Sequence, residues 1–406
     1  MKKIFSAIAT ILAVASCSGD GFLGDYEYAK DGGYMAAYGD YEGGVAGVGE
    51  GGEGEGNQQT GQAGVITAAE WNDLLNWSFW GGLMSGDYSK FNTYWGMNTA
   101  KRIAIEMVDP SGAPYICQPI SLVHDGKVLW EAMTDNKGEA NLWLAVEDVQ
   151  STVAAADCKV MTNDAEATGE PLKVYDWTST EPIVNKLTSA NAAPAPKSMA
   201  QIAFIVDATG SMMDEIDFLK KDLLDILDKA GQINDIKLYT GTVFYRDTDD
   251  AYLTRTSPFT DKVSETIAFI SKQTADGGGD LPEAVHTALE VTLKDLQWTS
   301  DAYASMAFML LDAPAHVDHN GVIESLQKSI RGFAAKGIKL IPVFCSSGDK
   351  TCEFMCRQMA ILTGGTYVFL TSDSGIGGEH VEASVGEYQV EHLNALILRL
   401  ITKYIQ

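Results

Sequence analysis

Short apolar runs alternate with amphipathic stretches through the C-terminal half of the chain. Residues 202–206, 306–311 and 338–344 are continuous apolar runs that end at turn signals. Such runs are typical of strands buried on both faces of a parallel sheet. Residues 212–230 carry apolar side chains at Ile216, Leu223 and Leu227, the spacing of one face of a helix. The pattern therefore predicts strand followed by helix from about residue 199 onward.

The same alternation continues to the C-terminus. Further strands are expected at 236–245 and 366–370, and further helices at 262–273, 281–296, 322–335 and in the last segment, where Val390, Leu393, Leu396, Ile397, Leu400 and Tyr404 share a face. Alternating strands and helices build an α/β fold with a doubly wound, mostly parallel sheet. We assign this Rossmann-like domain to residues 199–406.

The preceding region has a different pattern, with short strands and frequent turns. Strand signals at 103–107, 115–123, 128–133 and 140–144 are separated by Asp109-Pro110-Ser111-Gly112, Asp125-Gly126 and Asp135-Asn136-Lys137-Gly138. This pattern predicts a small antiparallel β-sandwich over residues 65–187. The proline-rich segment 188–198 is expected to link it to the α/β domain.

Four tryptophans lie close together at the start of this region, at positions 71, 77, 80 and 95. They could form a carbohydrate-binding platform. Clustered tryptophans are more often buried in a core or at a domain interface, so we favour that interpretation.

The N-terminus has the pattern of an export signal. Two lysines precede an apolar stretch from Ile4 to Ala15 that is too short to span a bilayer. The ending Val14-Ala15-Ser16-Cys17 resembles a bacterial lipobox, which implies a signal peptide over 1–16 and lipidation of Cys17. The Gly- and acid-rich residues 17–64 are expected to form a flexible tether. We therefore expect a bacterial cell-envelope protein of the outer membrane, held to the membrane by lipid alone, with surface exposure left open.

Composition limits the classes of partner and the chemistry of the cysteines. The formal net charge of −26 excludes a nucleic-acid-binding role, because phosphate binding needs a basic face. Outside the cytoplasm disulfides are permitted, and Cys117 and Cys158 are candidates for one within the first domain. No histidine or second cysteine pair stands at the spacing of a zinc site around Cys352 and Cys356.

Polar residues follow three of the predicted strands or loops and suggest a cation site. Asp207, Thr209 and Ser211 come directly after the strand at 202–206, Asp280 ends a triple-glycine loop, and Asp312 follows the strand at 306–311. The carboxyl ends of parallel strands meet at one edge of a sheet, where ligands bind. Carboxylate and hydroxyl oxygens suit a hard cation, so we expect Mg²⁺, with Mn²⁺ or Ca²⁺ as alternatives.

These motifs resemble two known families. Asp207-x-Thr209-x-Ser211, with Asp312 after a later strand, is similar to the von Willebrand factor A domain with its metal-ion-dependent adhesion site. The resemblance implies that the hydroxyls ligate Mg²⁺ and that a coordination position stays open for a partner. The turns at 109–112 and 135–138 resemble those of carboxypeptidase-regulatory-like, immunoglobulin-like β-domains over about residues 100–180, which implies a spacer domain.

Asp280 departs from the pattern of this resemblance, because many relatives carry threonine at its position. Three carboxylates around Mg²⁺ leave an excess negative charge, which should improve cation retention and oppose a partner's carboxylate. We expect a neutral oxygen ligand there, or a metal that chiefly holds the loops. Arg246, His316 and His319 lie near the same edge and could contact a ligand or a second cation. Alternatively, Arg246 pairs with an acid and the histidines are loop residues without a catalytic role, which is the interpretation that we favour for the histidines.

The leading functional interpretation is a surface-anchored lipoprotein that binds a protein or glycan partner through a divalent cation. A metal-dependent hydrolase is the first alternative, but His-Glu-x-x-His, Gly-x-Ser-x-Gly and phosphate-loop motifs are absent from the sequence. We therefore expect no enzyme and no catalytic residue. An envelope scaffold whose metal is purely structural is the second alternative.

Overall fold

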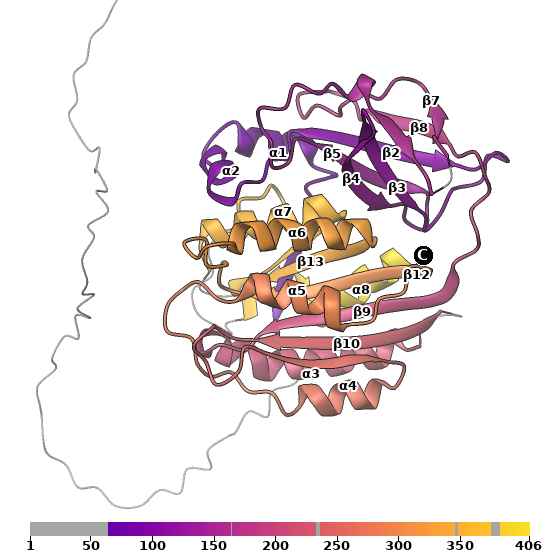
Figure 1. The fold of residues 1–406 in the computed structure, drawn as a ribbon. Coiled ribbons are helices and arrows are strands. Elements are labelled where there is room, and N and C mark those ends of the chain that lie inside the picture. The colour runs from indigo at the N-terminus through magenta and orange to yellow at the C-terminus, as the bar shows by residue number, and fades with distance from the viewer. Residues whose placement is uncertain (1–63, 164, 233–235, 346–347, 375–381) are drawn as a thin grey trace, which may run out of the picture. The chain divides into compact units, whose positions relative to one another are not determined.

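A large mixed sheet crosses the C-terminal part of the chain (Figure 1). Its order is β11-β10-β9-β12-β13-β14-β1-β15, in which β9, β10, β12, β13 and β14 run parallel and β11 and β1 run antiparallel to their neighbours. The strands are β1 (Thr67–Trp71), β9 (Lys197–Asp207), β10 (Lys237–Tyr245), β11 (Thr254–Thr260), β12 (Ala302–Leu311), β13 (Ile338–Phe344), β14 (Tyr367–Leu370) and β15 (Glu391–His392). The predicted α/β fold with a large, mostly parallel sheet is confirmed.

The computed structural model describes residues 64–163, 165–232, 236–345, 348–374 and 382–406. The predicted signal peptide at 1–16, the lipidation site Cys17 and the tether up to residue 63 lie outside the described residues. The described part of the chain belongs to one compact unit. The segments predicted as a first domain and a second domain therefore pack together within it.

Helices cover both faces of the sheet. Apolar side chains of α3, α4 and α8 pack with one face of β9, and those of α5, α6 and α7 pack with the other. No helix among the described residues is long and apolar enough to cross a membrane. The helices are α3 (Met213–Ala230), α4 (Val263–Ile270), α5 (Val285–Asp295), α6 (Val322–Ala335), α7 (Lys350–Thr363) and α8 (Leu393–Ile405).

The predicted helix over 281–296 begins only at Val285. Glu283 forms a parallel bridge with Ala315, and its backbone N–H donates to the Pro314 carbonyl at 2.8 Å. These contacts keep residues 281–284 out of the helix and hold them beside the loop that follows β12.

The N-terminal boundary of the β-region differs from the prediction. Residues 65–187 were expected as a separate sandwich, yet β1 pairs antiparallel with β14 and joins the large sheet. The Ala68 and Ala69 side chains are fully buried there. A partner strand some 300 positions later in the chain is invisible to local pattern, which is why the boundary was missed.

The remaining strands form two small sheets. One has the order β5-β2-β8-β7 and the other β4-β3-β6. Because β2 and β8 pair in parallel, the predicted antiparallel sandwich is not confirmed. The elements are α1 (Trp77–Met84), α2 (Ser89–Trp95), β2 (Lys101–Val108), β3 (Pro119–His124), β4 (Lys127–Met133), β5 (Glu139–Leu144), β6 (Lys159–Met161), β7 (Thr168–Gly169) and β8 (Val184–Thr188).

The tryptophan cluster is part of the core, as favoured from the sequence. Trp80 and Trp95 are fully buried, and the Trp80 ring stacks on Phe354 of α7 with centroids 5.9 Å apart. The Trp95 indole N–H donates to the Thr351 carbonyl at 3.2 Å. These rings join α1 and α2 to α7, so they are not exposed for carbohydrate binding.

The predicted disulfide between Cys117 and Cys158 is wrong, because both are free, buried thiols. Cys158 precedes β6, and the β3–β6 register pairs Val123 with Lys159. Cys117 therefore lies seven positions away along the ladder from the point opposite Cys158. At about 3.4 Å per residue that is roughly 24 Å, beyond the Cα separation that a disulfide bridges.

Candidate functional site

The strand order brings the predicted residues to one edge of the sheet, at the left in Figure 1. The chain passes from β9 to β10 on one side and returns to β12 on the other, so β9 and β12 flank a topological switch point. Asp207 ends β9 opposite Tyr245 of β10, and Asp312 directly follows β12. Crevices at such points are the usual ligand sites of open α/β sheets.

Asp207 is anchored on one carboxylate oxygen only. Its Oδ1 accepts from the Thr209 backbone N–H at 2.9 Å and from the Thr209 hydroxyl at 2.7 Å, and Ser211 Oγ lies 3.3 Å from Thr209 Oγ1. Asp207 Oδ2 is buried and has no hydrogen-bond partner. Burial raises the pKa of Asp207 to about 6, and the bonds from Thr209, followed by the nearby Tyr245 hydroxyl, oppose this shift.

The glycine loop is attached to the segment after β9 by backbone hydrogen bonds. The Gly210 N–H donates to the Gly277 carbonyl at 3.0 Å, and the Asp276 N–H donates to the Ala208 carbonyl at 3.0 Å. Gly277 has φ +85°, and a Cβ there would meet Asp250 Oδ1 at 2.1 Å. The position therefore requires glycine, and the resulting turn holds the loop beside Thr209.

Glu283 is a site residue that was not predicted from the sequence. It is 3% exposed, and its Oε2 has no hydrogen-bond partner. Burial, followed by the charges of Asp207, Asp247, Asp250 and Asp312, raises the pKa of Glu283 to about 9. The glutamate therefore lies among the other carboxylates. The only local signal is its place directly after Gly279-Asp280-Leu281-Pro282.

Tyr245 lies close to the carboxylates of Asp207, Glu283 and Asp312. Its side chain is fully buried, and its hydroxyl lies close enough to Asp207 to lower the pKa of that carboxyl, although the two do not form a hydrogen bond of ordinary length. Burial and then the charges of Asp207 and Glu283 hold the tyrosine pKa well above its usual range. The hydroxyl therefore stays neutral and carries no charge that could balance the acids.

Asp280 and Asp312 have different surroundings. Asp312 is 3% exposed, whereas Asp280 is exposed. The Asp280 carboxylate groups with Asp247 and His316, whose ligand atoms all lie within 4.8 Å of one another. Among the described His, Cys, Asp and Glu side chains, Asp207, Asp280 and Asp312 do not form such a tight group.

The predicted pairing of Arg246 is seen. It is 4% exposed, its Nη1 lies 3.7 Å from Asp276 Oδ2, and its Nη2 donates to the Thr274 carbonyl at 2.8 Å. Its guanidinium also stacks over the Tyr252 ring at 4.5 Å. Arg246 therefore supports the segment before the glycine loop.

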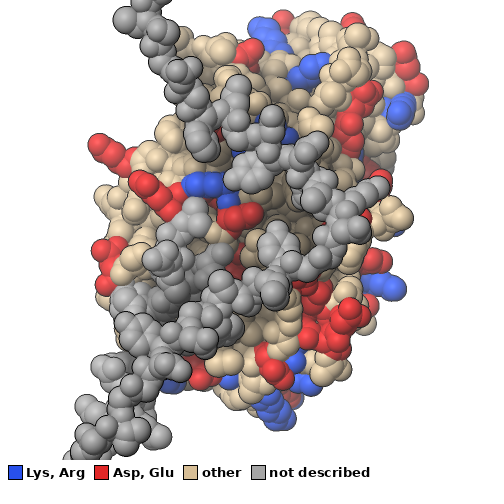
Figure 2. Space-filling view, turned by 90° about the vertical axis from the view of Figure 1, so that its left-hand side faces the viewer, with Lys and Arg blue, Asp and Glu red and all other residues tan. Residues whose placement is uncertain are grey.

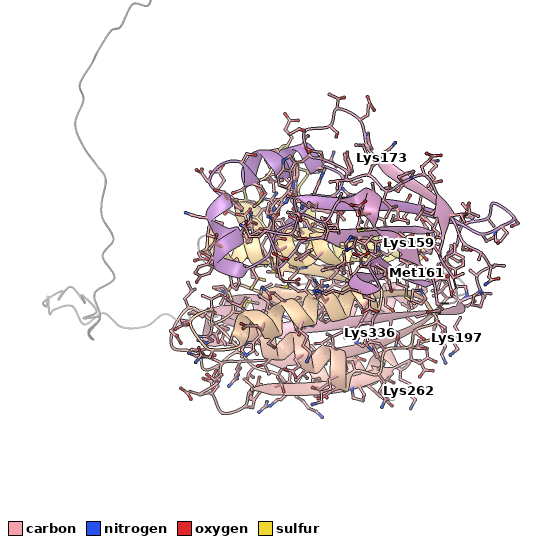
Figure 3. All side chains as sticks on the ribbon, turned by 45° about the horizontal axis from the view of Figure 1, so that its top comes forward. Lys159, Met161, Lys173, Lys197, Lys262 and Lys336 are labelled. Carbon is pink, nitrogen blue, oxygen red and sulfur yellow. The ribbon has the colours of Figure 1, made fainter. Side chains whose placement is uncertain are left out.

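The exposed lysines near the site's sheet need not balance its carboxylates. Figure 2 shows Asp and Glu side chains, with Lys and Arg among them, on the face to which the carboxyl ends of the strands point. Lys197, Lys262 and Lys336 lie toward the opposite end (Figure 3), where all three are exposed. These lysines are thus not placed to neutralise the buried carboxylates.

The donor set fits a hard divalent cation. Asp207 Oδ2 is buried without a hydrogen bond, Oδ1 of the same carboxylate accepts from the Thr209 hydroxyl, and the Ser211 hydroxyl lies 3.3 Å from that of Thr209. The neighbouring acids are oxygen ligands as well. Burying an uncompensated carboxylate is costly, and a cation removes that cost. The residues that would hold the ion are Asp207, Thr209, Ser211 and Asp312. Glu283 lies close to the two aspartates, whereas the Asp280 carboxylate groups with Asp247 and His316.

Comparison with known proteins agrees with this fold. Residues 201–344 match the family model of the von Willebrand factor A domain. A protein of Acanthamoeba polyphaga mimivirus named ariadne-like RING finger protein R811 is 29% identical over 194 residues, which is 43% of this chain and 19% of the relative. The alpha-protein kinase vwkA of Dictyostelium discoideum is 31% identical over 143 residues, 34% of this chain and 22% of the relative.

The chain thus spans about a fifth of the length of these curated relatives. The matched residues include Asp207, Thr209, Ser211, Asp280 and Asp312, and they run from β9 to the end of β13. The predicted resemblance to the von Willebrand factor A domain is confirmed over residues 201–344, which match its family model.

Proposed function

We propose that this protein is an envelope lipoprotein that binds a protein or glycan partner through a divalent cation on its von Willebrand factor A domain. The cation is held by Asp207, Thr209, Ser211 and Asp312, with Asp280 contributing from the glycine loop. When bound, Mg²⁺ supplies a Lewis-acidic coordination position that an oxygen atom of the partner can fill. We expect no catalysis.

The partner-less Oδ2 atom of Asp207 carries this proposal. The carboxylate is fully buried, and its other oxygen is already bonded to Thr209. The nearby Tyr245 hydroxyl lowers the pKa of Asp207 but makes no hydrogen bond of ordinary length with it and carries no charge. A buried anion that only held the fold together would be expected to have a hydrogen bond on each oxygen. An oxygen without one, beside two hydroxyls, is what a cation-binding cradle requires.

The number of carboxylates favours a neutral ligand oxygen on the partner. Asp207, Asp280 and Asp312 together outweigh the charge of a divalent cation, and Asp247 and Asp250 add further negative charge nearby. A partner carboxylate would meet a repulsive field. A glycan hydroxyl or a backbone or amide carbonyl would not.

The test is affinity capture from envelope extracts with the full-length protein, in Mg²⁺ and in chelator. We expect a partner that is retained in Mg²⁺ and lost in chelator. Thr209→Val removes the hydroxyl and should abolish capture, whereas Thr209→Ser keeps the hydroxyl and should restore it. This matched pair separates loss of a ligand oxygen from loss of side-chain volume.

The outcomes distinguish the alternatives. A partner retained equally in Mg²⁺ and in chelator would favour a scaffold whose metal is structural. Turnover of a phosphate or peptide substrate that is lost in folded Asp207→Ala would favour a hydrolase. Either result would overturn the proposal.

A further inference from the structure

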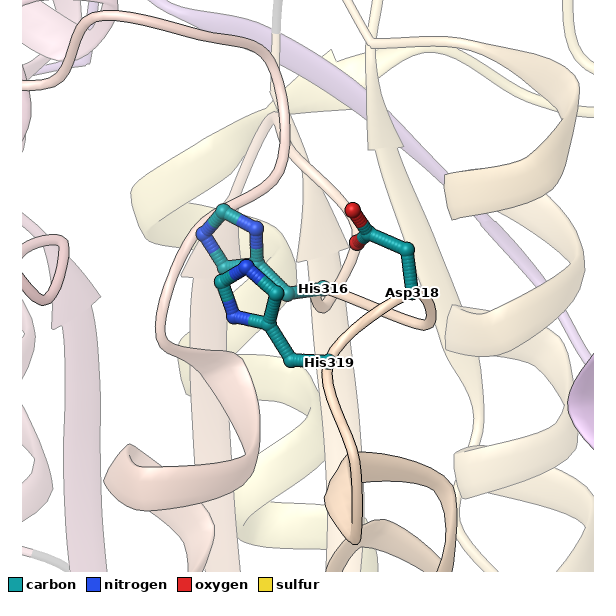
Figure 4. Close-up of side chains that lie close together, drawn as sticks. All are labelled: His316, Asp318 and His319. Atoms are coloured by element: carbon teal, nitrogen blue, oxygen red, sulfur yellow. The ribbon is translucent and has the colours of Figure 1, made fainter. Parts of the chain in front are cut away.

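Arg102 of β2 is a buried arginine that pairs with no acid among the described residues. Four buried basic side chains are described in the structure, and the other three each face a carboxylate within 4.0 Å. These pairs are Arg246 with Asp276, Arg357 with Asp73, and His316, whose ring is drawn in Figure 4, with Asp247. Arg102 is 8% exposed. A buried charge without a counterion is unfavourable, and an anion beside it would remove that cost.

The groups that contact the Arg102 guanidinium are neutral. Its Nε donates to Asn141 Oδ1 at 2.7 Å, and its Nη1 donates to the Leu74 carbonyl at 2.8 Å. The rings of Trp77 and Tyr175 lie 5.1 and 5.2 Å from its Cζ atom. Burial lowers the pKa of Arg102 to about 10, so the side chain remains charged at neutral pH. No hydrogen bond within the described ranges uses Arg102 Nη2 or Asn141 Nδ2, so two neighbouring donor groups are still available.

Arg102 and Asn141 line a cavity of about 230 Å³. The cavity lies near Lys339, where β13 begins, whereas Asp207 lies where the parallel strand β9 ends. It is therefore at the opposite end of the sheet from the candidate cation site. Its wall joins the turn after β4 to the end of α8, since Asn136 Nδ2 donates to the Tyr404 carbonyl at 3.3 Å. Pockets between two parts of a chain are common ligand sites.

The charges that line the cavity favour an anion. Basic side chains outnumber acidic ones there by four to two, although acids outnumber bases by 55 to 29 in the sequence. The basic members are Arg102, Lys137, Lys339 and Lys403, and the acidic members are Asp135 and Glu139. Lys339 Nζ lies 3.8 Å from Asp135 Oδ2, and Lys403 Nζ lies 3.3 Å from Glu70 Oε1, so these two lysines are partly balanced. The charge of Arg102 is the one left for a ligand.

We propose that this cavity binds a small hydroxylated molecule whose carboxylate or phosphate group contacts Arg102 and Asn141. A guanidinium pairs with either oxyanion through parallel N–H donors. The amides of Asn72 and Asn136 also line the cavity, and amides can bond to hydroxyl groups on the rest of the molecule. The volume is below that of pockets for drug-sized ligands, so the occupant is about the size of one sugar acid.

The test is calorimetric titration of the full-length protein with glucuronate and with glucose 6-phosphate, in metal-free buffer so that no cation at Asp207 can hold the anion. Glucose is the matched neutral ligand, because it lacks the oxyanion. We expect one equivalent of at least one acid to bind and glucose not to bind. Binding of glucuronate alone would assign the site to carboxylates, and binding of glucose 6-phosphate alone would assign it to phosphates. Failure of both acids to bind would overturn the proposal.

Two variants test the role of the arginine. Arg102→Met removes the charge and should weaken binding of the acid about 10–100-fold. Asn141→Asp places a carboxylate beside Arg102 Nε, so it should raise the Tm of the ligand-free protein and abolish binding of the acid. An arginine with a structural role alone would leave the affinity for the acid unchanged in both variants.

Arg331→Met is the matched control. Arg331 is paired with Glu147 and does not line the cavity, so this variant should bind the acid like the wild type. Wild-type affinity in folded Arg102→Met and Asn141→Asp would overturn the proposal. Equal binding of glucose and of the acids would also overturn it, because the oxyanion would then not be recognised. The cavity shares no residue with the candidate cation site, so these results do not depend on the proposed function.

Discussion

A buried ion pair joins the N-terminal segment to α7, and removing it should destabilise the whole folded unit. Arg357 Nε donates to Asp73 Oδ2 at 2.9 Å and Nη2 donates to Asp73 Oδ1 at 2.5 Å. Neither side chain is more than 3% exposed. The perturbation is Asp73→Asn, which keeps the shape of the side chain and removes its charge.

The expected loss of stability in Asp73→Asn depends on the contacts that Arg357 keeps in the variant. Arg357 Nη1 still reaches Glu353 Oε1 at 3.3 Å and the Ser384 carbonyl at 2.6 Å, so its charge is not left wholly unpaired. Breaking a buried pair costs about 3–5 kcal/mol, and we expect the lower end, about 3 kcal/mol. At about 2–4 °C per kcal/mol this lowers the Tm by roughly 6–12 °C.

The assay is urea unfolding followed by tryptophan fluorescence. The Trp80 ring lies 5.0 Å from the Arg357 guanidinium and reports directly on this contact. Glu147→Gln is the matched control, because Glu147 pairs with Arg331 of α6 at a more exposed position. Its cost should stay below about 1 kcal/mol. Equal costs for the two variants, or separate transitions for the N-terminal and C-terminal parts, would refute the reasoning.

Three further predictions concern the carboxylates and the loop. Burial raises the pKa of the Asp222 carboxyl to about 6 in the folded protein, above its value in the unfolded chain. The free energy of unfolding therefore falls as the pH rises from about 4 through 6. Asp222→Asn should therefore raise the free energy of unfolding at pH 7 by up to about 3 kcal/mol and not at pH 4, and a gain that does not depend on pH would contradict this. Gly277→Ala should lower the free energy of unfolding by about 1–3 kcal/mol and weaken Mg²⁺ binding in calorimetry, because the new Cβ would clash with the Asp250 carboxylate. Wild-type stability and wild-type Mg²⁺ affinity in this variant would contradict the prediction. Asp280→Thr should weaken Mg²⁺ binding and improve capture of an acidic partner, because it removes one negative charge. If Mg²⁺ affinity and partner capture are both unchanged, the Asp280 charge does not have this effect.

The central strands and most helices could be predicted because their signals are local. The apolar run at 338–344 and the helical stripe at 322–335 coincide with β13 and α6. The motif at 207–211 identified the right edge of the sheet because parallel strands end together. These features need only the residues that form them.

Features that depend on distant partners were missed. Nothing around Thr67–Trp71 indicates that it pairs with β14, and nothing around Arg357 indicates Asp73. Glu283 and the Asp247–His316 contact likewise need the loops after three strands to be placed in space. The disulfide prediction failed for the same reason, since the number of cysteines does not show which of them lie opposite one another in the sheet.

The most direct test of the cation site is the thermal stability of the full-length protein with and without Mg²⁺, compared between wild type and Asp207→Ala. The structure predicts that Mg²⁺ raises the Tm of the wild type, because the ion binds the folded state, and leaves the Tm of Asp207→Ala unchanged. Equal stabilisation of both proteins, or none in the wild type, would contradict a cation site built on Asp207.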